Sequence, residues 1–179
     1  MDPADPPATP DCAAWIASIH SGVDVARATG LQHVAGCTGS TSEDAVRKHY
    51  GLPLEAMLDM GDFAGGLLKY LRDHPVARVT IGGGFGKMVK LAQGALDLHS
   101  GRSQVDLDWL AAIAPELSRE KVAAANTSQQ VLEMAGGFDL GARIAAAALT
   151  SVKQVLRGAP IAPDVMIISR HGAVIGHAV

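Results

Sequence analysis

The chain has 179 residues, of which 48 % are hydrophobic and 18 % are charged, and its net charge is −3. This length suits one globular domain, and the apolar fraction is high enough to bury a core, which excludes a disordered chain. The positive charges are scattered, which excludes a nucleic-acid-binding protein. The longest apolar stretch, 144–149, is far shorter than the roughly 20 residues that cross a bilayer, so no membrane span is expected.

The amino-terminal segment, residues 1–10, contains four prolines and no apolar periodicity. We expect a flexible leader there, or the boundary with an upstream segment, and a single domain over residues 11–179. The segment lacks the basic cap and apolar core of a secretory signal, so a cytoplasmic location is expected. The two cysteines, Cys12 and Cys37, are too few for a disulfide framework or a four-sulfur metal site, and both are expected to be reduced.

The first half of the chain alternates between helix and strand patterns. Apolar residues recur at helical spacing from Asp11 until Gly30 ends the run. Three strand-then-helix units with short links follow. The expected strands are 32–37, 56–60 and 76–81, and the expected helices are 40–50, 63–73 and 87–99. Ser40 and Glu43, three residues apart, predict a capping box at the start of the second of these helices.

The second half begins with a helical pattern over 106–157, and we expect these helices to flank the sheet. A strand at 165–169, a turn at His171-Gly172 and a strand at 173–176 then predict a β-hairpin at the sheet edge. The order of the elements predicts an α/β fold, with a mostly parallel sheet, helices on both faces and a carboxy-terminal hairpin.

The third expected strand ends in the run Gly82-Gly83-Gly84-Phe85-Gly86, which leads into a helix. Glycines expose main-chain N–H groups and a helix start is partly positive, so this turn favours anionic or polar ligand groups. Ligands of open parallel sheets bind at this edge. A tight connection without a ligand is the alternative. Met88 disfavours a P-loop, which needs Ser or Thr there, and Lys87 replaces the third glycine of a dinucleotide fingerprint.

The helix expected over 87–99 places Lys87 and Lys90 on the face opposite its apolar residues. Two lysines beside a glycine suit a large ligand that carries carboxylates, and a solvated helix face is the alternative for Lys90. His99 and Arg102 follow near the end of the helix and combine a titratable imidazole with a fixed cation. For His99 the alternative is capping of the carbonyls at the helix end.

Two groups of residues, in this order and at this spacing, resemble the signature of the cobalt-precorrin-5B methyltransferase family. They are Met60-Gly61-Asp62-Phe63, and the run from Gly86 to Gly94 followed by His99-Ser100. Segments 13–19 and 38–43 are similar to the family as well, so the resemblance covers nearly all of the chain from Asp11. This sequence departs from the family pattern in two respects.

Family members are about twice as long, and the Thr-Thr-Gly-rich motif of their amino-terminal half has no counterpart here. The family also has Asn-Thr-His-Ser where this sequence has Asp97-Leu98-His99-Ser100. The chain therefore resembles the carboxy-terminal half only.

The resemblance implies an enzyme of cobalamin biosynthesis that transfers a methyl group from S-adenosylmethionine (SAM) to ring carbon 1 of a cobalt-containing tetrapyrrole. Under this hypothesis the turn of Gly82, Gly83, Gly84 and Gly86 cradles SAM. Asp62 holds its ribose hydroxyls or its amine, with an N-cap as the alternative for this residue.

Positive side chains would meet the acetate and propionate arms of the tetrapyrrole, namely those of Lys87, Lys90 and Arg102. His99 is the candidate for a proton acceptor or a further carboxylate contact. Cobalt belongs to the substrate, so no metal site is expected in the protein. The other histidines show no spacing of metal ligands and are interpreted as surface or turn residues. They are His20, His33, His49, His74, His171 and His177.

The half-length chain leaves other functions open. A partner chain or a homo-oligomer could complete the site. One alternative is a non-catalytic module that binds a corrinoid or SAM without turnover. A second is a nucleotide-dependent oxidoreductase that uses the glycine turn.

Overall fold

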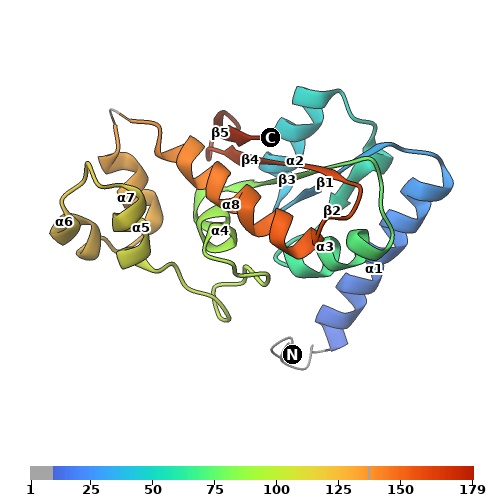
Figure 1. Cartoon of the computed structure of the whole chain (residues 1–179), viewed down its shortest axis with the longest axis horizontal. Helices are drawn as coiled ribbons and strands as arrows, with labels where there is room; N and C mark the ends of the chain where they lie inside the picture. The colour runs from blue at the N-terminus through green and yellow to red at the C-terminus, as the bar shows by residue number, and fades with distance from the viewer. Residues whose placement is uncertain (1–9, 137) are drawn as a thin grey trace.

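The structure is a computed structural model that describes residues 10–136 and 138–179. One sheet of five strands, in the order β2-β1-β3-β4-β5, lies at its centre (Figure 1). The first four strands of this order are parallel, and the fifth is antiparallel to its neighbour. The strands are β1 (His33–Cys37), β2 (Met57–Asp59), β3 (Arg78–Gly84), β4 (Ala162–Ile168) and β5 (Val174–Ala178).

This arrangement confirms the predicted α/β fold and the carboxy-terminal hairpin. The leader expected at residues 1–10 lies, apart from Pro10, outside the described residues. The helices of the described residues are α1 (Pro10–Ala28), α2 (Ser40–Tyr50), α3 (Ala64–Asp73), α4 (Phe85–Ala92), α5 (Leu107–Ile113), α6 (Arg119–Ala123), α7 (Ser128–Met134) and α8 (Leu140–Leu156), with a 3₁₀ turn at Leu54–Ala56.

Helices cover the two faces of the sheet unequally. On one face α2 packs alone against β1, β3 and β4, over a small core that includes Ala35, Val46 and Met166. On the other face α1, α3, α4 and α8 share one large core with the sheet. Successive strand residues point to opposite faces, so Val34 joins the large core while Ala35 joins the small one.

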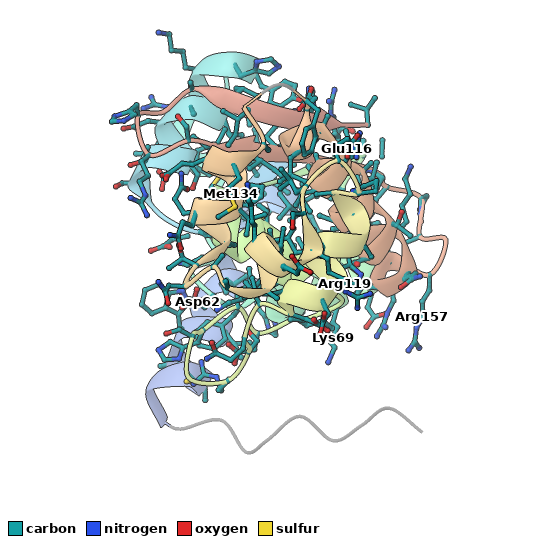
Figure 2. All side chains as sticks on the ribbon, turned by 90° about the vertical axis from the view of Figure 1, so that its left-hand side faces the viewer. Asp62, Lys69, Glu116, Arg119, Met134 and Arg157 are labelled. Atoms are coloured by element: carbon teal, nitrogen blue, oxygen red, sulfur yellow. The ribbon has the colours of Figure 1, made fainter. Side chains whose placement is uncertain are left out.

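The helices predicted over 106–157 form two groups. α8 flanks the sheet as expected, because its buried side chains pack on β4 and β5. α5, α6 and α7 lie beyond the sheet instead (Figure 1). α7 contacts α4, α5 contacts α8 and α6 packs on α5, so the expectation that they flank the sheet is wrong. Figure 2 looks onto this group, with Arg119 and Met134 labelled on its outer side.

The glycine run is placed differently from the prediction. β3 continues through Gly84 and α4 begins at Phe85, so Gly82 and Gly83 are strand residues rather than part of a turn. A Cβ at Gly82 would lie 2.7 Å from Val46 Cγ2, and one at Gly83 would lie 2.6 Å from Met88 Cε. Side chains of α2 and α4 therefore fill the space that these two glycines leave.

Two helix ends also differ from the sequence predictions. α4 ends at Ala92, and the chain then turns through Gly94, whose φ of 91° suits glycine. The helix expected over 87–99 is thus too long by about two turns. At the start of α2 the N-cap is Gly39, Ser40 is already helical and Ser42 Oγ donates a hydrogen bond to Gly39 O at 2.7 Å, so the predicted capping box is absent.

Candidate functional site

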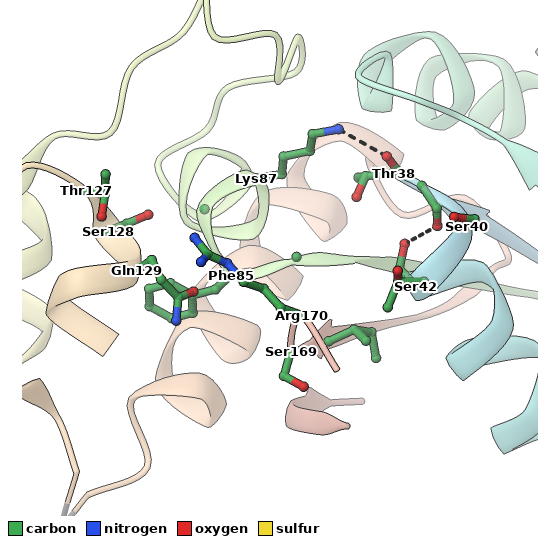
Figure 3. A pocket seen from close by; sticks show the side chains of 15 residues that line it. Thr38, Ser40, Ser42, Phe85, Lys87, Thr127, Ser128, Gln129, Ser169 and Arg170 are labelled. Carbon is green, nitrogen blue, oxygen red and sulfur yellow. Dashed lines mark hydrogen bonds between the residues drawn. The ribbon is translucent and has the colours of Figure 1, made fainter. Parts of the chain in front are cut away.

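Two adjoining cavities lie at the carboxyl ends of the parallel strands. The first, here called the sheet-edge cavity, has a volume of about 610 Å³. Its lining residues are Thr38, Gly39, Ser40, Thr41, Ser42, Gly84, Phe85, Gly86, Lys87, Thr127, Ser128, Gln129, Ile168, Ser169 and Arg170 (Figure 3). The second, here called the lysine cavity, has a volume of about 540 Å³. Its lining residues are Asp62, Gly86, Lys87, Lys90, Leu98, His99, Ser100, Gln104, Val105, Leu107, Asn126, Thr127 and Ser128.

The cavities share a wall. Gly86, Lys87, Thr127 and Ser128 line both of them, so ligands in the two cavities would lie next to each other. Cavities of this size match those that enclose small-molecule ligands. They also lie where open parallel sheets bind their ligands, outside the carboxyl ends of the strands.

The sheet-edge cavity is positively charged. The beginnings of α2 and α4 contribute to its lining, and a helix start carries partial positive charge. Its lining includes two cations, Lys87 and Arg170, and no aspartate or glutamate. Hydroxyl groups of serine and threonine from three separate loops supply neutral hydrogen-bonding partners. A ligand with an anionic group and several polar groups suits this lining.

The structure places the four glycines of the predicted cradle in two different environments. Gly84 and Gly86 line the sheet-edge cavity, and a Cβ at Gly84 would meet nothing within 4 Å. Gly82 and Gly83 line neither cavity, because their Cβ positions face Val46 and Met88. Gly84 is therefore the open point of the run, and the two preceding glycines serve the packing of the sheet.

Lys87 stands in the wall between the cavities. Its Nζ lies 2.9 Å from Asp62 Oδ1 in an ion pair and donates a hydrogen bond to Thr38 O at 3.1 Å. Asp62 does not cap a helix. The N-cap of α3 is Phe63, and no side-chain hydrogen bond caps this helix start. Within the described part of the chain the buried Asp62 Oδ1 accepts no hydrogen bond beyond this ion pair. The Asp62 side chain is 23 % exposed and lines the lysine cavity, so the exposed part of its carboxylate can accept a hydrogen bond from a ligand there.

Lys90 is a buried cation rather than a residue of a solvated helix face. It is 8 % exposed, and its Nζ donates one hydrogen bond, to Leu98 O at 2.9 Å. Leu98 N donates in turn to Asp62 O at 2.8 Å, which fixes the segment after Gly94 against the start of α3. No carboxylate of the described residues forms an ion pair with Lys90. A buried charge without a counter-ion is costly, so an anionic ligand group would relieve it.

His99 also lines the lysine cavity, at its exposed rim. Its Nδ1 accepts a hydrogen bond from Gly101 N at 3.0 Å, so a neutral ring carries its proton on Nε2. This tautomer makes Nε2 a donor, which suits a contact to a carboxylate better than proton abstraction.

Arg102 does not line either cavity. It is paired with Asp97, and its guanidinium lies 5.7 Å from the centre of the Phe63 ring.

Residues that the sequence reasoning missed make up much of the sheet-edge cavity. Thr38 follows β1, Thr127 and Gln129 belong to the start of α7, and Arg170 follows β4. The sequence carried one usable signal, since loops after parallel strands meet at one edge of the sheet. Nothing local indicated that α7 would reach this edge.

A second polar cluster lies at the opposite ends of the strands. Asp164 on β4 is 1 % exposed and accepts hydrogen bonds from Tyr50 Oη and from Arg78, the latter at 2.6 Å. His177 Nε2 lies 3.4 Å from the same carboxylate, and His33 Nε2 lies 2.8 Å from Thr80 Oγ1.

These contacts correct the interpretation of His33 as a plain surface or turn residue, because it is a half-buried strand residue on β1. His177, on β5, is exposed as expected, and its ring joins the same network. Burial raises the pKa of Asp164, but hydrogen bonds from Thr80, Tyr50 and Arg78 outweigh it and lower the value overall. Burial and Asp164 raise the pKa of Tyr50 to about 12. The network ties α2 to the sheet, and it is far from both cavities.

Within residues 10–136 and 138–179, no group of three or more His, Cys, Asp and Glu side chains is arranged to hold a metal ion. In the same ranges, no helix combines the length and the hydropathy that a membrane span requires.

Comparison with known proteins finds a family match in the second half of the chain. Residues 97–179 match the family model described as "CbiD, C-terminal domain". The matched residues include His99, Thr127 and Arg170 of the cavities described above, whereas Asp62 and Lys87 precede the match in the sequence.

Curated relatives extend the likeness to most of the chain. A cobalt-precorrin-5B C(1)-methyltransferase of Paramagnetospirillum magneticum is 58 % identical over 172 residues, which are 93 % of this chain and 48 % of the relative. Enzymes of the same name from Brucella anthropi and Brucella ovis are 53 % identical over 171 residues, 92 % of this chain and 46 % of each relative. The chain thus spans about half the length of the curated relatives it matches. No solved structure matches it significantly.

Proposed function

We propose that this chain is the carboxy-terminal part of a SAM-dependent methyltransferase that methylates ring carbon 1 of cobalt-precorrin-5B in cobalamin biosynthesis. The observation that carries the proposal is the 58 % identity to a curated cobalt-precorrin-5B C(1)-methyltransferase over 93 % of this chain. The paired cavities support it, because methyl transfer needs a donor and an acceptor bound side by side.

The sheet-edge cavity fits the donor. Its 610 Å³ are within the range that encloses a molecule of this size, and Gly84 leaves open a place that any side chain would occupy. Gly84 and Gly86 let the main chain approach the ligand closely, and the start of α4 favours its anionic end. Asp62, which is paired with Lys87 and lines the neighbouring lysine cavity, would accept from the ribose hydroxyls or from the amine where the two cavities adjoin.

When bound, SAM supplies a methyl group that its sulfonium already activates. The part of this chain is therefore to align the two ligands and to keep water away from them. The shared wall of Gly86, Lys87, Thr127 and Ser128 would separate the bodies of the two ligands and let their reacting ends meet. No nucleophilic side chain is needed for this chemistry.

The lysine cavity fits an arm of the acceptor. Lys90 offers a buried ammonium to which the described residues supply no counter-ion, and Nε2–H of His99 lies at the rim as a second donor for the same kind of carboxylate. A tetrapyrrole is too wide for this cavity alone, so most of the macrocycle would extend outward, where Arg102 is within reach of another arm. A partner chain, or a second copy of this one, would cover the exposed part of the macrocycle.

Incubation with cobalt-precorrin-5B and SAM tests the proposal. The protein is assayed alone and after co-expression with the amino-terminal half of the Paramagnetospirillum relative, and the product is analysed by mass spectrometry. A singly methylated tetrapyrrole in either arm supports the proposal. Tight binding of either ligand without product in both arms would instead identify a non-catalytic binding module. Binding of NAD and not of SAM would favour the oxidoreductase alternative.

A further inference from the structure

Arg170 is the one cation of the sheet-edge cavity that the described residues leave without a partner. Of the two lining cations, Lys87 is already paired with Asp62 and bonded to Thr38 O. The Arg170 guanidinium has neither a hydrogen-bond partner nor an ion-pair partner in the described part of the chain. Figure 3 shows its side chain extending from the end of β4 across the cavity, towards Phe85 and Gln129.

The turn between β4 and β5 holds Arg170 at this place. Gly172 N donates to Ser169 O at 3.0 Å, and Ser169 N donates to Ala173 O at 2.8 Å. Ser169 Oγ accepts a further bond from Ala173 N at 3.0 Å, and Gly172 has a φ of 79° that closes the turn. The main chain on both sides of Arg170 is therefore fixed, although its side chain is exposed.

The register of the sheet sets Arg170 opposite the open glycine. Ile168 pairs with Gly84, so the chain leaves β4 beside the point where β3 ends, and Arg170 follows two residues later. A guanidinium on one side and the start of α4 on the other then face the same space. This pair of positive groups, in a lining without aspartate or glutamate, suits a carboxylate, which arginine can bind through two parallel hydrogen bonds.

We propose that Arg170 binds the carboxylate of the methyl donor and selects donors whose amino-acid end is intact. This inference rests on the proposed function and adds a specificity-determining residue to it. A donor that lacks the carboxylate would leave the guanidinium without its anion, and it would lose the bonds that orient the amino-acid end.

Calorimetric titration with SAM and with decarboxylated SAM tests the inference, because the two ligands differ in the carboxylate alone. We expect the unchanged protein to prefer SAM, and we expect Arg170→Ala to weaken SAM binding by about 10- to 100-fold. The affinity for decarboxylated SAM should change less than twofold, so the preference disappears. Arg170→Lys should restore part of it. His171→Ala, in the same turn, should leave both affinities unchanged.

Each other outcome contradicts the inference in a distinct way. An Arg170→Ala variant with unchanged SAM affinity shows that the guanidinium does not bind the donor. An equal loss of affinity for SAM and for decarboxylated SAM shows that Arg170 has a role that does not involve the carboxylate. Unchanged SAM affinity with an increased KM for the tetrapyrrole assigns Arg170 to the acceptor. Failure of the unchanged protein to bind SAM, even with the amino-terminal half of the relative present, overturns the proposed function together with the inference.

Discussion

Replacement of Lys90 by methionine should separate binding from stability. The Lys90 ammonium is buried, and among the described residues it is bonded only to Leu98 O and has no carboxylate partner. Burial of such a charge costs several kcal/mol, while one bond from a charged donor returns about 1.5–3 kcal/mol. Lys90→Met removes both the cost of burying the charge and the hydrogen bond to Leu98 O, and it nearly conserves the side-chain volume. It also leaves Leu98 O without a hydrogen bond, which costs about 1–3 kcal/mol. We expect the free energy of unfolding to change by less than about 2 kcal/mol, because these terms largely cancel.

Ligand binding should respond much more strongly. Loss of one partner of a buried, hydrogen-bonded charge pair costs about 2–5 kcal/mol, which is a factor of roughly 30 to several thousand in affinity. Urea denaturation measures stability, and spectroscopic titration with cobalt-precorrin-5B measures binding. Lys153→Met, on the exposed side of α8, is the control for removal of a lysine. The reasoning is refuted if the free energy of unfolding of Lys90→Met is lower by more than about 3 kcal/mol and the variant still binds the tetrapyrrole with unchanged affinity.

Two further predictions concern stability. Burial and Arg78 lower the pKa of His33 below its ordinary value of 6.5, so between the two values the unfolded chain binds more protons. The free energy of unfolding should therefore fall as the pH drops below about 6.5. His33→Gln should reduce this pH dependence, which urea titrations across that range measure. Equal slopes of the free energy of unfolding against pH in the two proteins would contradict the prediction. Gly82→Ala should destabilise the fold by about 1–3 kcal/mol, because the added Cβ would meet Val46 at 2.7 Å, and an unchanged melting temperature would contradict this.

The fold could be predicted from the sequence because its signals are local. Alternating strand and helix patterns with short links lead to a parallel sheet almost regardless of detail. The errors arose where distant residues decide. Gly82 in isolation is typical of a turn, but it lies in a strand because it pairs with Cys37 and Met166, and Val46 packs over it. The placement of α5–α7 beyond the sheet depends likewise on the contacts of α4 and α8, which no periodicity reveals.

Part of the candidate site could be predicted from short segments of the sequence. Asp62, Gly84 and Lys87 were predicted as site residues, and the structure brings all three to the walls of the two cavities. Arg170 was not predicted, because a lone arginine in a hairpin turn comes to line this cavity only once β4 pairs with β3. The burial of Lys90 was also unpredictable, since it depends on the early end of α4 and on the return of the chain over its side chain at Leu98.

The most direct test of a donor site at the sheet edge is calorimetric titration of S-adenosylhomocysteine into the unchanged protein and into Gly84→Val. Gly84 has φ −68° and ψ 154°, which valine adopts freely, and its Cβ position meets nothing within 4 Å. The variant should therefore keep its melting temperature while its side chain occupies the cavity. We predict micromolar or tighter binding by the unchanged protein and a loss of at least about tenfold in the variant. Equal affinity of the two proteins would contradict the account.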